Sequence, residues 1–95
     1  MCTMITERIK ISGSGKGRDG WFRLGEANLS FDHPFDAPFE HALNIDFVNE
    51  SLGTGARVAV ELSEQSARAL VAGILDVLDR AETGGHLEEE PGSAV

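Results

Sequence analysis

A chain of 95 residues, 41% of them apolar, has the length and composition of one small globular domain. Its net charge of −8 at pH 7 excludes the basic surface that nucleic acids and anionic membranes require. No apolar run approaches the ~20 residues of a transmembrane helix, and the N-terminus lacks the apolar core of a signal peptide. We therefore expect a cytoplasmic protein, and its single cysteine, Cys2, fits a reducing compartment.

Alternating apolar and polar residues predict the first strand at residues 3–12. Glu7 falls on the same face of this strand as three isoleucines, namely Ile5, Ile9 and Ile11. Glu7 therefore either reaches water at the margin of the sheet or points into a pocket. Residues 13–20 contain four glycines and are expected to form a flexible hairpin connection. A phosphate-binding loop is disfavoured there, because a strand follows where such a loop needs a helix.

The middle of the chain predicts two strands joined by a bend. Residues 21–33 form the second strand, in which Gly25 is a candidate bulge position. Pro34 ends this strand, because proline has no amide hydrogen to donate to the ladder. The bend at residues 34–38 then leads to the third strand at residues 40–48.

A fourth strand at residues 57–62 precedes the predicted helix, for which Ser63 is a natural N-cap. The order β-β-β-β-α predicts an α+β fold, a four-stranded antiparallel sheet with one C-terminal amphipathic helix on one face. We expect residues 1–81 to form this single domain and the acidic residues 82–95 to be a disordered tail. Because one helix covers only part of such a sheet, we also expect a homodimer.

Two histidines, His33 and His41, flank the predicted bend. If the second and third strands pair as a hairpin around it, these side chains lie close together at its mouth. With Cys2 they would form a Cys–His–His set, which suits zinc first and copper or iron next. Nearby carboxylates could complete or orient this set, namely Asp32, Asp36 and Glu40.

Other interpretations of these residues stay open. The histidines could be satisfied hydrogen-bonding groups, or a metal-free site in which one histidine is a general acid or base. No short motif such as HxxxH or CxxC supports a metal site. Cys2 could act as an N-terminal nucleophile after removal of Met1, or simply pack at a sheet edge. Asn44 and Asp46 share the opposite, polar face of their strand, and they would need partners if a second copy covered it.

Four segments carry a resemblance to known proteins, and they are ERIKISGSGKGRDGWF, FDHP, EHALNIDFVN and ARVAVELSEQSARALV. Over about residues 2–80 they resemble a family of short, uncharacterised actinobacterial proteins. The resemblance implies a bacterial cytoplasmic domain that stands alone, and it transfers no catalytic residues. Small α+β proteins of this size sometimes serve as cyclases, isomerases or binding subunits in secondary metabolism, which is an association by size alone.

Two functional hypotheses follow. The first is a small-ligand or metal-ion site around His33 and His41, with Cys2 and Glu7 as candidate contributors, in a small enzyme of secondary metabolism. The second is a non-enzymatic interaction module that docks a partner protein through the exposed sheet face or an edge strand. Substitution of the two histidines separates them, because only the first hypothesis requires the imidazoles.

Overall fold

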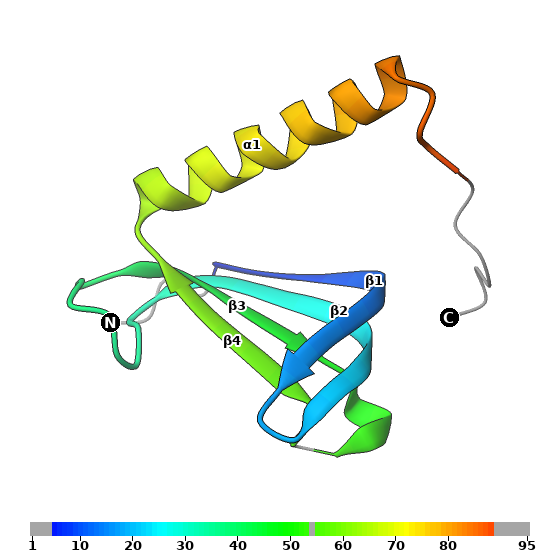
Figure 1. The fold of residues 1–95 in the computed structure, drawn as a ribbon. Coiled ribbons are helices and arrows are strands. Elements are labelled where there is room, and N and C mark those ends of the chain that lie inside the picture. Colours follow the sequence, from blue (N-terminus) through cyan, green and yellow to red (C-terminus); the bar gives the residue numbers. More distant parts are fainter. Residues whose placement is uncertain (1–4, 54, 89–95) are drawn as a thin grey trace.

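The computed structural model describes residues 5–53 and 55–88 of the chain. Four strands form one sheet in chain order, and every neighbouring pair is antiparallel. The elements are β1 (Ile5–Gly17), β2 (Gly20–Asp32), β3 (Ala42–Val48), a short 3-10 helix (Glu50–Leu52), β4 (Arg57–Leu62) and α1 (Glu64–Thr83). Figure 1 shows the sheet on one side and α1 above it. The predicted α+β fold class is confirmed.

The first hairpin is longer than the sequence predicted. β1 continues to Gly17, and only residues 18–19 connect it to β2, so the expectation of a loop over residues 13–20 was wrong. The glycines there have a packing role, because they make room for side chains of β2. A Cβ atom added at Gly15 would lie 2.9 Å from Leu24 Cδ2, and one at Gly17 would lie 3.1 Å from Phe22 Cε1.

The predicted irregularity at Gly25 is present. Lys10 pairs with Glu26 and Gly13 pairs with Leu24, so two residues of β1 lie opposite Gly25 alone. This is a β-bulge with its extra residue on β1, a feature that bends and twists the bulged strand.

Between the bulge and the helical end of the sheet, apolar side chains gather on one face. The opposed residues form three rows across all four strands: Ile5–Phe31–Leu43–Leu62, Glu7–Leu29–Ile45–Val60 and Ile9–Ala27–Phe47–Val58. We call these twelve residues the apolar sheet face. Glu7 is the one charged residue among them. The other face is polar and carries two ion pairs between neighbouring strands, Arg8–Glu26 and Asp46–Arg57.

α1 begins where the sequence predicted. Ser63 alone separates it from β4, and the Ser63 hydroxyl oxygen accepts the backbone N–H of Ser66 at 3.1 Å. Ion pairs between residues four apart lie along its polar side, namely Glu64–Arg68 and Asp76–Arg80. The helix ends at Thr83, so it extends two residues past position 81, where we expected the domain to end. No helix in the described part of the chain is long and apolar enough to cross a membrane.

The core of this single chain is very small. Among residues 5–53 and 55–88, the only buried apolar residues are Ala27, Ala42 and Ala56, and no residue of α1 is buried. α1 approaches the sheet near the ends of β3 and β4 and then extends above it (Figure 1). The helix of one chain therefore leaves most of its own apolar sheet face uncovered.

Candidate functional site

The loop between β2 and β3 brings the two predicted histidines together. The ring centroids of His33 and His41 lie 4.8 Å apart with 24° between the ring planes, so the rings stack. The ring of Phe31 also stacks with His41, at 5.9 Å and 14°. Asp32 and Ala42 form the last pair of the ladder, so both histidines lie just beyond the strands rather than within them. We call Phe31, His41 and His33 the three-ring stack.

Backbone contacts orient His33. Its ring Nδ1 lies 2.7 Å from the backbone oxygen of Glu40, and a carbonyl oxygen can only accept, so Nδ1 donates. Nε2 of the neutral ring is then an acceptor, able to bind a proton donor or a metal ion. The amide of His33 donates to Oδ1 of Asp32 at 2.7 Å. Two of the three acidic residues that we expected near the histidines thus contact His33: Glu40 through its backbone oxygen, and Asp32 through its carboxylate.

Glu61 of β4 holds the loop that carries the histidines. Its carboxylate oxygens accept three consecutive backbone N–H groups, from Phe35 at 2.5 Å, Asp36 at 3.0 Å and Ala37 at 2.9 Å. These hydrogen bonds, with that from Ala37 contributing most, lower the pKa of Glu61 because they favour its charged form. No local sequence pattern predicts this role of Glu61, because its partners lie 24 to 26 residues away in the chain.

Glu7, a further predicted site residue, is not brought to the histidines. Glu7 pairs with Leu29, which is four residues and so about 13 Å along β2 from His33. It lines a separate hollow of about 370 Å³ that Asn28 and Asp46 also border. Cys2 lies outside the described residues. Within the described ranges there is no group of three or more His, Cys, Asp or Glu side chains that could hold a metal ion.

A pocket of about 400 Å³ lies beside the three-ring stack. Phe31 and Leu43 of the sheet line one side, and the first turns of α1 line the other with Glu64, Ala67 and Arg68. Phe31 therefore belongs to both the pocket and the stack. The volume is within the range of small-molecule sites, which is roughly 300–1,000 Å³.

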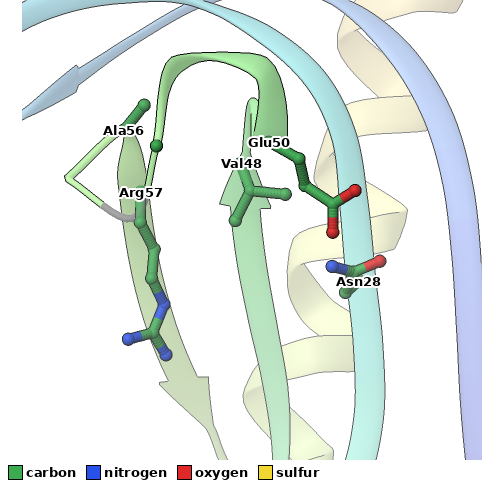
Figure 2. Close-up of a pocket in the computed structure, with 6 residues that line it drawn as sticks. Asn28, Val48, Glu50, Ala56 and Arg57 are labelled. Atoms are coloured by element: carbon green, nitrogen blue, oxygen red, sulfur yellow. The ribbon is translucent and has the colours of Figure 1, made fainter.

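A second pocket, of about 430 Å³, opens on the polar face at the opposite end of the sheet. Figure 2 shows Glu50 and Arg57 on opposite sides of it, with Val48 between them. The Arg57 guanidinium is already engaged, because its Nη2 lies 2.7 Å from Oδ1 of Asp46. Asp46, expected on a polar strand face, thus has a partner on β4. The positive charge of Arg57 is therefore paired with Asp46 and is not free to bind a ligand in this pocket.

The most unusual surface of the chain is apolar. Six large apolar residues of α1 are between 47% and 61% exposed, and they are Leu70, Val71, Ile74, Leu75, Val77 and Leu78. We call these six the helix stripe. On the apolar sheet face, Ile5 is 62% and Ile9 is 42% exposed, and Ala27 alone of the twelve residues is buried. Exposed apolar surfaces of this extent mark interaction sites in folded proteins.

The fold is that of a small α+β domain with one antiparallel sheet and one C-terminal helix. Its apolar sheet face and its helix stripe are open to solvent. Within that class, the chain belongs to a family of unknown function, DUF6295, whose sequence profile matches residues 1–87. No curated protein and no solved structure matches the chain. Its function is therefore argued from geometry.

Proposed function

We propose that this protein is a non-enzymatic interaction module that docks a protein partner through its apolar sheet face and helix stripe. One observation carries the proposal: in the described ranges no apolar residue larger than alanine is buried, whereas the helix stripe is about half exposed. A domain that is stable alone buries large apolar side chains in its core. Here the partner supplies the missing half of the core.

The distribution of charge supports docking at this surface. The chain has a net charge of −8, yet Glu7 is the one charged residue on the apolar sheet face, and the helix stripe has none. Four charged residues of α1 instead form two ion pairs within the helix, Glu64–Arg68 and Asp76–Arg80. Depletion of charge at the centre is typical of protein interfaces.

The free energy available is large for so small a chain. Complete burial of a Leu, Ile or Val side chain contributes about 1.5–3 kcal/mol, so completing the burial of a half-exposed one contributes about 1 kcal/mol. For the six residues of the helix stripe this is about 6 kcal/mol, similar to the whole net stability of a small domain. Docking can therefore decide whether the fold is stable.

The proposal is tested by affinity purification from the native host. A tagged copy of the protein, the bait, is expressed there together with the untagged chain. The bait carries either no change, Ile74→Glu in the helix stripe, or Ala72→Glu on the polar side of α1 between Arg68 and Asp76. We expect one stoichiometric protein with the unchanged bait and with Ala72→Glu, and its loss with Ile74→Glu. Recovery that is equal for all three baits, or no stoichiometric protein at all, would contradict the proposal.

A second candidate is a small-ligand or transition-metal site at the three-ring stack, which would make the protein a small enzyme if it is catalytic. The stacking of His33 on His41, with Nε2 of His33 left as an acceptor, favours this function. A histidine would act there as general acid or base, or would hold a zinc-activated water, with Cys2 as a further ligand.

Elemental analysis of untagged protein, beside a His33→Ala/His41→Ala variant, tests the metal form of this candidate. A near-stoichiometric transition metal that is lost in the variant supports it. A metal-free protein of unchanged stability removes the metal form and leaves acid-base chemistry alone. Retention of the stoichiometric partner by the double variant would show that the histidines are not needed for docking.

A further inference from the structure

We propose that the docking partner is a second copy of this chain, and that α1 of each copy lies on the apolar sheet face of the other. This inference rests on the interaction function proposed above and names its partner. The resulting dimer is two-fold symmetric, with the same two surfaces used by both copies.

One chain leaves a large apolar surface open. Within the described residues, the six side chains of the helix stripe are 47–61% exposed, and Ile5 and Ile9 of the apolar sheet face are 62% and 42% exposed. An interface of standard size buries about 800 Å² on each partner and is apolar at its centre, which is the surface that these side chains offer.

One chain also holds both halves of a missing core. The apolar sheet face lacks a covering layer, and the helix stripe lacks a sheet to lie on. An unrelated partner would have to bring both an apolar helix and an apolar sheet. A second copy brings both by symmetry, and each open surface is then covered by the other.

The direction in which α1 leaves the sheet favours contact with another molecule. Ser63 is the whole connection between β4 and α1, and its side chain caps the helix. A helix of 20 residues is about 30 Å long, but only its first turns approach the sheet, where a pocket still separates Ala67 from Phe31 and Leu43. In Figure 1 the rest of α1 extends above the sheet. This presents the helix stripe to another molecule.

Charge does not oppose the contact, although each chain has a net charge of −8. Glu7, the one charged residue on the apolar sheet face, is exposed on the edge strand β1 and so lies at the rim of the covered area. Two acidic residues of α1, Glu64 and Asp76, are already paired with Arg68 and Arg80 of the same helix, which offsets their negative charge. The two surfaces that meet are therefore apolar at the centre.

The experiment combines mass measurement with contact measurement on the full chain. Light scattering during size exclusion should give twice the 10.2 kDa of one chain. In a mixture of ¹³C-labelled and unlabelled protein, isotope-filtered NOEs should connect Ile74 and Leu78 of one copy with Leu29 and Ile45 of the other. Ile74→Glu should shift the protein to monomer, whereas Ala72→Glu, with the same charge on the same helix, should stay dimeric.

The outcomes that would contradict the dimer differ from those that would contradict the interaction function. A monomer at every concentration overturns the inference. If its helix stripe still binds an apolar dye, the interaction function stands with another partner; if intrachain NOEs join α1 to Leu29 and Ile45, both proposals fail. A dimer whose intermolecular NOEs avoid the helix stripe overturns the exchange of helices. The NOEs are measured on the unchanged chain, so they decide the matter even if Ile74→Glu does not fold.

Discussion

Glu61 of β4 accepts the backbone N–H of Ala37 at 2.9 Å, although 24 residues separate the two in the chain. With Phe35 and Asp36, Ala37 fixes the loop before His41 onto the last strand. The geometry of the three-ring stack thus depends on a carboxylate of β4, a strand that lies beside β3 in the sheet but is distant from the loop in the sequence.

We predict that this loop detaches in acid. The folded pKa of Glu61 is lowered from the ordinary value of 4.5, chiefly by the N–H groups of Ala37 and Phe35. The stability that it contributes is therefore present above pH 4.5 and is lost as the pH falls through the lower folded pKa. Amide chemical shifts of residues 35–37 should move together in that acid range.

Glu61→Gln should abolish this pH dependence and loosen the loop at neutral pH, while Glu82→Gln, a change at an exposed carboxylate near the end of α1, should leave it intact. An acid transition at residues 35–37 that persists in Glu61→Gln would show that another group holds the loop.

His41 should matter more to stability than His33. His41 contacts both Phe31 and His33, so His41→Ala removes two ring contacts and His33→Ala removes one. His33→Ala also removes the hydrogen bond from Nδ1 to Glu40, but this bond is exposed and water can replace it. At about 0.5–1.5 kcal/mol for each ring pair, we expect losses of about 2 and about 1 kcal/mol in urea unfolding. His86→Ala, at an exposed residue after α1, is the control and should change little. Equal losses for His33→Ala and His41→Ala would argue against an additive stack.

The glycines of the first hairpin should differ in tolerance. Gly15→Ala places a Cβ atom 2.9 Å from Leu24 Cδ2, so Leu24 must move, and we expect a loss of about 1 kcal/mol in the free energy of unfolding. Gly25→Ala is the matched change on the neighbouring strand, where the nearest atom is the oxygen of Val48 at 3.7 Å. Its effect should be below about 0.5 kcal/mol. If Gly15→Ala were the better tolerated of the two, the packing role of Gly15 would be wrong.

The helix cap gives a prediction about the start of α1. Ser63→Ala removes the acceptor of the Ser66 N–H and should cost about 1 kcal/mol. Ser66→Ala keeps that hydrogen bond, since Ser66 donates through its amide, and should be close to neutral. Thermal unfolding followed by circular dichroism compares the two. A Ser63→Ala protein as stable as the wild type would mean that the cap does not contribute.

Local patterns in the chain predicted much of the fold. Alternation placed β3 and β4 within two residues, and Ser63 with the apolar spacing after it placed the start of α1. The proximity of His33 and His41 also followed from the sequence, because a hairpin around a bend brings its flanking residues together. The glycine content of residues 13–17 predicted a loop, and this prediction was wrong. These glycines lie in β1, where they make room for the side chains of Leu24 and Phe22.

The amino-acid sequence by itself thus determined the strand order, the helix and the pairing of the histidines, since each depends on neighbours within about ten residues. Only the tertiary structure decided that Glu61 holds the loop and that Glu7 lies far from His33, because these relationships join distant segments. It also decided that the helix stripe lies open rather than on its own sheet. An amphipathic pattern shows that a face must be buried, but the direction of the chain at Ser63 determines what that face can reach.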